Sequence, residues 1–241
     1  MRLVSARIAA PYLFALLLSC LIDLLLRVRL LFDLNFYEVT HHQFSDHLLR
    51  FLVGGYFLIL SVFLVFFLVK ILPRILRNGS LDRRDVSFFG FLATLQLVSN
   101  LIVINLAIYL VSIASYELLC ESIALYFSIN LIFLFWYWFL DYPLRHKRLM
   151  LVGTDGNNGI GIPLGILFPE EAMERDLSGS DVWTPGFVDY VFFTLVSSNT
   201  FGSPEGHGVI GSRLKWTQVF HSICMILVFI VIVARAINTL A

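Results

Sequence analysis

The sequence predicts an all-α, polytopic membrane protein with about five transmembrane helices and a short re-entrant-type helix before the last of them. Two observations support this prediction. Of the 241 residues, 59% are hydrophobic and only 14% are charged, whereas soluble domains average roughly 45–50% apolar and about 25% charged residues. The apolar residues also gather in runs of about 20, the length that crosses a bilayer. We therefore expect the lipid bilayer to be the solvent of this chain.

Five apolar runs are long enough, or nearly so, to span a bilayer. They are approximately Ile8–Phe32, Phe51–Leu76, Phe88–Ser115, Ile123–Tyr142 and Trp216–Asn238. The first run is too long for a secretory signal and has no small-residue cleavage site, so we expect it to be retained. A further apolar run, Phe187–Phe201, is only about 15 residues long, which is short for a span and typical of a re-entrant half-helix.

These runs divide the chain into three predicted regions. Residues 1–144 form a four-helix transmembrane region, residues 145–185 a polar connector rich in Gly, Asp and Glu, and residues 186–241 a short helix, a turn and the final span. Lys and Arg gather before the first span, in the second connector and at the start of the fourth connector. By the positive-inside rule, this distribution predicts a cytoplasmic N-terminus.

Several polar residues fall inside the predicted spans, where their burial is costly and each is a candidate functional group. Asp23 and Arg27 are four residues apart, so we expect a structural ion pair, with a role in gating or permeation as the alternative. The amides Gln96 and Asn100 are expected to join helices by hydrogen bonds, with a polar pathway as the alternative. His221, in the last span, is expected to have a structural hydrogen-bonding role.

The sequence offers no case for an enzyme, a cofactor or a metal site. GxSxG, HExxH and Cys–His arrangements are absent, and the three cysteines form no CxxC pair. The best metal candidates, His42 and Asp46, have helical spacing but lie in a predicted external loop without a second ligand cluster. The glycine-rich run 153–161 lacks the residues of a calcium or phosphate loop, so we interpret it as a turn. The net charge of zero does not favour nucleic acid, and no such partner is expected.

The last third contains a short apolar stretch with a polar stripe. Tyr190, Thr194 and Ser197 fall at helical positions i, i+4 and i+7, which predicts a short amphipathic helix after the Pro185-Gly186 turn. A turn of small, hydroxyl-bearing residues follows, and then a full span. Irregular backbone at membrane depth is tolerated only where protein or water surrounds it. A half-helix, an exposed turn and a full helix together form the layout of a pore loop.

The C-terminal half of the chain contains several motifs: Trp136-Tyr137-Trp138, Phe168-Pro169, Trp183-x-Pro185-x-Phe187-x-Asp189-Tyr190, Ser203-Pro204 and Ala234-Arg235-Ala236-Ile237-Asn238. In these motifs the chain resembles a family of uncharacterised bacterial integral membrane proteins. More distantly, the hairpin resembles the pore-loop module of tetrameric cation channels, in which Asp-Tyr starts the pore helix and Thr-Val-Gly-Tyr-Gly-Asp forms the filter. The resemblance implies a multi-pass protein of the bacterial inner membrane.

The channel resemblance places a potassium-type filter on residues that do not suit it. Thr200-Phe201-Gly202 aligns with Thr-Val-Gly, but Pro204 falls on the second Gly of the filter. Proline is locked near φ of about −65°, whereas that Gly adopts a conformation open chiefly to Gly. Any selectivity for inorganic ions would then come from side chains. The pore-lining candidates are Thr194, Ser197, Ser198, Thr200, Ser203 and, at the mouth, Glu205.

We therefore predict a channel-like, homo-oligomeric membrane protein that conducts or senses inorganic ions through its C-terminal hairpin. The alternative is a non-conducting protein in which the hairpin is structural or docks a partner. With four spans before it and a cytoplasmic N-terminus, the hairpin would enter the membrane from the cytoplasm, whereas cation-channel pore loops of this layout enter from outside. A re-entrant short helix, a sixth full span and an inverted hairpin remain open.

Overall fold

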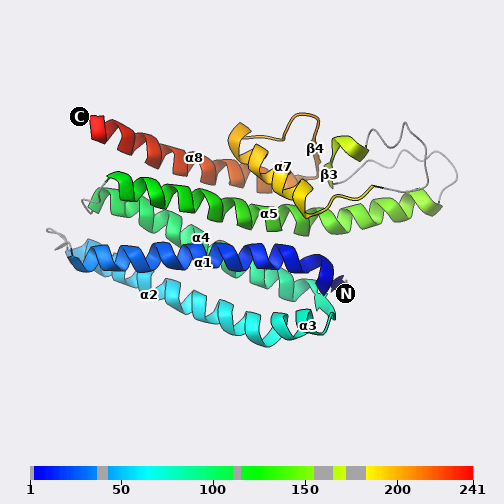
Figure 1. Cartoon of the computed structure of the whole chain (residues 1–241), viewed down its shortest axis with the longest axis horizontal. Coiled ribbons are helices and arrows are strands. Elements are labelled where there is room, and N and C mark those ends of the chain that lie inside the picture. The colour runs from blue at the N-terminus through cyan, green and yellow to red at the C-terminus, as the bar shows by residue number, and fades with distance from the viewer. Residues whose placement is uncertain (1–2, 37–42, 111–114, 155–164, 172–182, 241) are drawn as a thin grey trace. The chain divides into compact units, whose positions relative to one another are not determined.

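The computed structural model of the chain describes residues 3–36, 43–110, 115–154, 165–171 and 183–240 (Figure 1). Within these residues, five helices are long and apolar enough to cross a membrane. The candidate spans are Ala6–Arg29, Gly54–Leu76, Arg83–Asn105, Leu119–Arg145 and Ser212–Val233. The prediction of an all-α, multi-pass membrane protein is confirmed.

The described elements are long helices with two small pairs of strands. In chain order they are β1 (Leu3–Ser5), α1 (Ala6–Phe36), α2 (Gln43–Phe66), the π-helical segment η1 (Phe67–Ile71), α3 (Leu72–Leu76), β2 (Ser80–Asp82), α4 (Arg83–Leu110), α5 (Ser115–Thr154), β3 (Gly165–Leu167), α7 (Phe187–Thr200), β4 (Gly208–Ile210) and α8 (Ser212–Leu240). The strands pair antiparallel, β1 with β2 and β3 with β4. Neither pair was predicted from the sequence, because three-residue strands leave almost no periodic signal.

The contacts divide the chain into two compact units. Unit 1 comprises residues 1–132 and 226–241, and unit 2 comprises residues 133–225. Because α5 and α8 each contribute residues to both units, the boundaries fall inside helices. The predicted division at residues 144 and 185 follows hydropathy along the chain and stays a prediction, whereas these units reflect packing in space.

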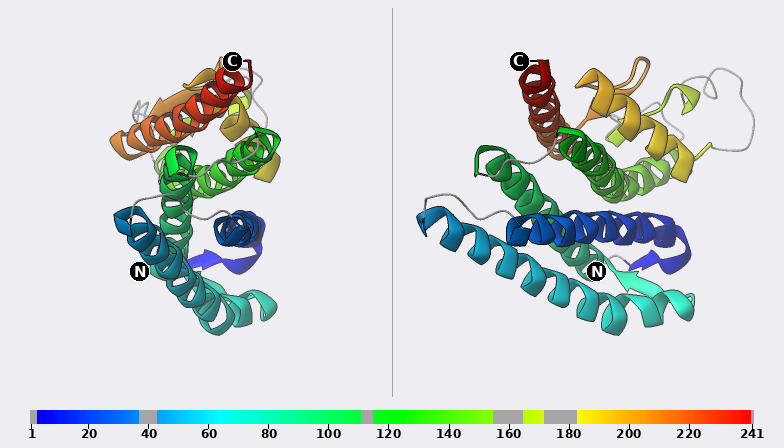
Figure 2. Two further views of the ribbon diagram at one scale, coloured as in Figure 1. Left: turned by 90° about the vertical axis from the view of Figure 1, so that its left-hand side faces the viewer. Right: turned by 60° about the vertical axis from the view of Figure 1, so that its left-hand side comes forward.

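Unit 1 is a bundle in which α1 and α2 both pack on α4 (Figures 1 and 2). Its core is apolar and aromatic: the rings of Phe63 on α2 and Phe89 on α4 stack with centroids 4.2 Å apart. At one end of the bundle, β1 and β2 pair through Val4 and Leu81, which are both buried. This small sheet ties the start of α1 to the turn that precedes α4.

Unit 2 contains α7, the β3–β4 pair and adjoining parts of α5 and α8. The helix α7 packs on α5 through Phe193. Its ring contacts that of Tyr137 edge-on, and the ring centroids are 4.9 Å apart. Phe168, just after β3, contacts the rings of both Tyr190 and Phe193. The short helix and the strand pair therefore share one aromatic core.

The predicted short helix is present as α7. At 1.5 Å per residue, its 14 residues extend over about 21 Å, less than the roughly 30 Å of a bilayer's hydrocarbon core. It begins after Gly186, whose N–H donates to Oδ2 of Asp189 at 2.7 Å. It ends at Thr200, and Phe201 directly after it has a left-handed φ of 52°. A left-handed residue at this position ends a helix and turns the chain away.

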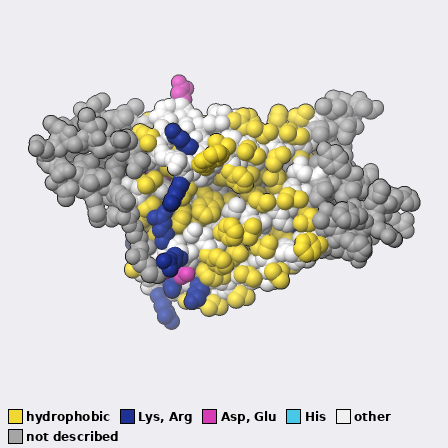
Figure 3. Space-filling model, turned by 180° about the vertical axis from the view of Figure 1, so that it is seen from behind, with side chains coloured by type: hydrophobic (Ala, Val, Ile, Leu, Met, Phe, Trp, Pro, Cys, Tyr) yellow, Lys and Arg dark blue, Asp and Glu magenta, His cyan; other side chains and the backbone are white. Residues whose placement is uncertain are grey.

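The described helices expose many large apolar side chains. Those on α8 include Trp216, Val219, Phe220, Ile223, Ile226, Phe229 and Ile230. Figure 3 shows hydrophobic side chains over much of the face it displays, with Lys and Arg side chains gathered near one edge. A surface of this kind suits contact with acyl chains, with the cations at the level of the lipid head groups.

Candidate functional site

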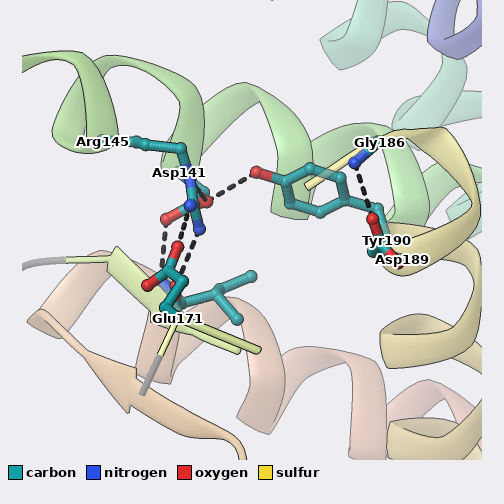
Figure 4. A network of polar contacts seen from close by, with 7 residues as sticks. Asp141, Arg145, Glu171, Gly186, Asp189 and Tyr190 are labelled. Atoms are coloured by element: carbon teal, nitrogen blue, oxygen red, sulfur yellow. Dashed lines mark hydrogen bonds and ion pairs between the residues drawn. The ribbon is translucent and has the colours of Figure 1, made fainter. Parts of the chain in front are cut away.

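A polar network in unit 2 is centred on Asp141 of α5, which is fully buried. Its Oδ1 accepts a hydrogen bond from the backbone N–H of Ile166 at 2.7 Å. Its Oδ2 accepts from the hydroxyl of Tyr190 at 2.6 Å and from Nε of Arg145 at 3.3 Å (Figure 4). One carboxylate thus joins α5, β3 and α7, three elements far apart in the sequence.

Arg145, one helical turn after Asp141, completes this network (Figure 4). Its Nη1 forms an ion pair with the carboxylate of Glu171, and its Nη2 donates to the backbone carbonyl of Ile166 at 3.1 Å. The guanidinium also lies over the ring of Phe168, 5.5 Å from the centroid. Buried charges are tolerated where they are paired and hydrogen-bonded, and each charge of this network has such a partner.

Gly165 allows β3 to approach Asp141 closely. Its φ is +118°, and a Cβ at this position would lie 2.3 Å from Oδ1 of Asp141. Any side chain would therefore both strain the backbone and collide with the carboxylate. The network fixes the strand pair on one side and, through Tyr190, the start of α7 on the other.

The turn after α7 is tied to α8 by two side chains. Ser222 donates to the backbone carbonyl of Phe201 at 3.2 Å, and Nε2 of Gln218 donates to Oγ of Ser203 at 3.1 Å. The chain then makes a tight turn in which the N–H of His207 donates to the carbonyl of Pro204 and Gly206 has a φ of +79°. This turn leads into β4.

The predicted pore-lining candidates fall into two groups. Thr194, Ser197 and Ser198 are buried, and the hydroxyls of Thr194 and Ser198 donate to the carbonyls of Tyr190 and Leu195 in their own helix. The second group consists of the exposed residues Thr200, Ser203 and Glu205. The polar stripe of α7 therefore faces the interior of unit 2, while the exposed side of the helix carries apolar residues such as Val188 and Phe192.

His221, predicted as a structural residue, is buried in unit 2. Its Nδ1 lies 3.2 Å from the hydroxyl of Tyr137, and its ring stacks on Phe133 with centroids 4.3 Å apart. These contacts hold α8 against α5. The structural role of His221 stays a prediction.

The intramembrane candidates of unit 1 gather in its interior, where Asp23, Arg27, Gln96 and Asn100 are all buried. Asn100 donates to the backbone carbonyl of Asp23 and thus joins α4 to α1. The expected ion pair is not formed: among the described contacts, Arg27 instead donates to Ser99 on α4, and Asp23 accepts from Ser128 on α5.

Among the residues that the structure describes, no group of three or more His, Cys, Asp or Glu side chains is placed to hold a metal ion. The metal candidate His42 and most of the glycine-rich run lie outside the described residues, and the side chain of Asp46 is likewise not described.

The sequence did not reveal the network around Asp141. The sequence indicates no role for Asp141 or Arg145, and it indicates Tyr190 only as part of a motif and of the polar stripe of the short helix. The four-residue spacing of Asp141 and Arg145 was the available signal, because such a pair shares one helix face. Nothing local indicated that Ile166, Tyr190 and Glu171 would join them.

Together, the five candidate spans and the buried polar anchors define a multi-pass helical membrane protein. Comparison of the chain with protein-family models, with curated proteins and with solved structures finds no match.

Proposed function

We propose that the protein forms a homo-oligomeric pore for inorganic cations through the turn that follows α7. The observation that supports this most is the layout of the C-terminal hairpin. A helix too short to cross the bilayer is anchored at its start by Tyr190 and Asp141, and it ends in an exposed polar turn. Ser222 and Gln218 of α8, a helix long enough to span the bilayer, hold that turn in place. Pore loops have this layout, because it places irregular backbone at membrane depth.

The residues that would line the pore are Thr200, Ser203 and Glu205, because their side chains are exposed in the single chain. Hydroxyl oxygens replace part of a cation's hydration shell, and a ring of carboxylates at the mouth attracts cations. Thr194, Ser197 and Ser198 are removed from the pore-lining set, because they face the interior of unit 2. Potassium-type selectivity by stacked carbonyls is not proposed, because of Pro204 and because Ser222 already donates to the carbonyl of Phe201.

Several copies of the chain are required, since one hairpin cannot enclose a pore. In the proposed assembly, the exposed turns of several copies face a common axis. We further propose that the protein lies in a bacterial inner membrane with its N-terminus in the cytoplasm, as its resemblance to a family of bacterial membrane proteins and its charge distribution suggest.

A non-conducting role is the alternative, and the inward-facing polar stripe of α7 favours it. If Thr194 and Ser197 serve only to pack the short helix, the hairpin is a structural element or a docking site. The mass of the protein in detergent separates the two: a single-chain mass supports the alternative, and a multiple of it supports a pore.

Reconstitution of the purified protein in liposomes tests the proposal. We expect cation flux down an imposed K⁺ or Na⁺ gradient, and Glu205→Gln should lower it on the order of a few-fold at low ionic strength. The effect should shrink as salt rises, because salt screens the mouth charge.

Asp82→Asn is the matched control, since it removes one acidic charge outside the hairpin, on β2. Its flux should equal that of the unaltered protein. Absence of flux under every gradient and voltage, from protein that is folded and correctly inserted, would overturn the proposal.

A further inference from the structure

The interior of unit 1 holds a polar cluster that the proposed pore does not use. Its members come from four helices and lie within the candidate spans. They are Ser19, Cys20, Asp23 and Arg27 of α1, Tyr56 of α2, Gln96, Ser99 and Asn100 of α4, and Ser128 of α5. Asp23 and Arg27 are 0% and 1% exposed, so two opposite charges lie inside an apolar bundle. Ionisable groups in such a place mark functional sites by default.

Hydrogen bonds from two other helices hold Asp23 in place. Its Oδ1 accepts from the hydroxyl of Ser128 at 2.8 Å, and Ser128 in turn lies 2.9 Å from the hydroxyl of Ser19. Asn100 donates to the backbone carbonyl of Asp23 at 3.2 Å. Only Oδ1 of the carboxylate is therefore hydrogen-bonded, because Oδ2 has no hydrogen-bond partner among the described residues.

The guanidinium of Arg27 likewise has only part of its hydrogen-bonding capacity met among the described residues. Its Nη2 donates to the hydroxyl of Ser99 at 2.9 Å, and its guanidinium lies over the ring of Tyr56, 4.8 Å from the centroid. Its Nε and Nη1, and the hydroxyl of Tyr56, have no partner among the described residues, although all three atoms are buried. An unmet buried donor costs about 1–3 kcal/mol, and more when it is charged.

The chemistry of the unmet atoms restricts what binds there. A ligand must accept hydrogen bonds from Arg27 and donate one to Oδ2 of Asp23. An anion bound there permanently would be repelled by Asp23, and a metal cation by Arg27, so neither is a suitable resident ligand. A small neutral molecule that both donates and accepts meets every requirement, and water is the smallest such molecule.

We propose that Asp23 is a proton-binding site that bound water connects to Arg27. A hydronium ion that reaches the site transfers its proton to Oδ2 of Asp23. One O–H bond of the hydronium breaks, an Oδ2–H bond forms, and a water molecule remains beside Arg27. Unit 1 thereby takes up and releases protons within its membrane-spanning helices, independently of the hairpin in unit 2.

Among the described residues, few other titratable groups surround Asp23. Arg27 and Cys20 face it from α1, and Tyr56 contacts Arg27 from α2. From α4 and α5, the described side chains in the cluster are neutral amides and hydroxyls. Glu121 is the nearest further acid of the described part of α5, seven residues before Ser128, or about 10 Å along the helix.

Infrared difference spectroscopy of the reconstituted protein, labelled with ¹³C at its aspartate carboxyls, tests this proposal. On acidification we expect a carboxylic acid C=O band that carries the ¹³C shift, which separates it from Glu121. The band should move to lower frequency in D₂O, because bound water exchanges the proton. Asp23→Asn should abolish it, and Asp82→Asn should leave it unchanged.

Ser128→Ala provides a second, milder variant in case Asp23→Asn does not fold. It removes the hydrogen bond to Oδ1 of Asp23, so it should shift the band without abolishing it. Absence of an aspartate band that responds to Asp23→Asn or Ser128→Ala overturns the proposal. A band that responds to these variants but does not move in D₂O also overturns it, because water then has no access to the site.

Discussion

Two aspartate–arginine pairs in this chain share a spacing of four residues but make different contacts. Asp141 and Arg145 on α5 form an ion pair at 3.3 Å, whereas Asp23 and Arg27 on α1 each bond to a different helix. Helical spacing places two side chains on one face, but neighbouring helices decide whether they meet. Around Arg145, Glu171 and the carbonyl of Ile166 satisfy the guanidinium. Around Arg27, only Ser99 does so among the described residues.

At the residue scale, we predict that Tyr190→Phe destabilises the protein. The change removes the hydrogen bond of 2.6 Å to the buried carboxylate of Asp141. A hydrogen bond to a charged group contributes about 1.5–3 kcal/mol, so the free energy of unfolding should fall by that amount. Denaturant unfolding in mixed micelles measures the change.

Tyr142→Phe is the matched control, because the hydroxyl of Tyr142 makes no hydrogen bond among the described contacts and its ring packs on Trp138. We expect its unfolding free energy to stay close to that of the unaltered protein. Equal stability of the two variants would show that the bond from Tyr190 does not anchor α7.

At the scale of elements, β3 depends on a glycine for its position against α5. Gly165 and Gly211 have nearly the same φ, +118° and +121°, but only Gly165 faces an atom that a Cβ would meet. This pair of glycines separates the effect of backbone strain from that of steric collision.

We predict that Gly165→Ala is markedly more destabilising than Gly211→Ala. Both changes place a side chain at positive φ, which costs about 1–3 kcal/mol. Gly165→Ala in addition brings a Cβ within 2.3 Å of Oδ1 of Asp141 and must displace that carboxylate. Unfolding measurements on both variants in the same detergent give the difference. Equal losses would show that β3 does not press against Asp141.

For the pore proposed above, the orientation of α7 predicts which hydroxyls should affect ion flux. Thr194→Val should leave flux unchanged, since Thr194 is buried and its hydroxyl donates to the carbonyl of Tyr190. Thr200→Val makes the same change of shape at an exposed position and should alter flux or ion preference. Liposome flux assays compare the two variants. An effect of Thr194→Val alone would place the pore on the opposite face of α7.

At the scale of the whole molecule, the membrane class follows from five candidate spans and from the apolar side chains that they expose. The positive-inside rule then predicts that the β1–β2 end of unit 1 lies in the cytoplasm. If α7 is re-entrant, the turn after it opens to the same side, because four spans precede it.

Cysteine labelling tests this topology. We predict that Ser80→Cys on β2 and Ser203→Cys after α7, both at exposed positions, react with an impermeant reagent from the cytoplasmic side only. Cys120, which is exposed, is first replaced by Ser to remove the background. Labelling in detergent verifies that each cysteine reacts. Modification of Ser203→Cys from the opposite side would mean that α7 crosses the membrane.

The sequence predicted the fold closely and the polar contacts poorly. The spans and the short helix 187–200 follow from local hydropathy, a property of each segment by itself. By contrast, Tyr190 and Asp141 are 49 residues apart, and Arg27 and Ser99 are 72 apart. Such contacts depend on how helices rotate about their axes, and a single sequence carries little information about that rotation.

The sequence by itself determined that this is a multi-pass helical membrane protein with a short helix before its last span, because the free energy of burying apolar residues in lipid dominates each segment. The tertiary structure alone decided that the polar stripe of α7 faces protein, that Asp141 joins three elements, and that Asp23 and Arg27 do not pair. In an apolar solvent, buried polar groups form hydrogen bonds with whichever partners the packing of helices places within reach. That packing is a property of the whole fold.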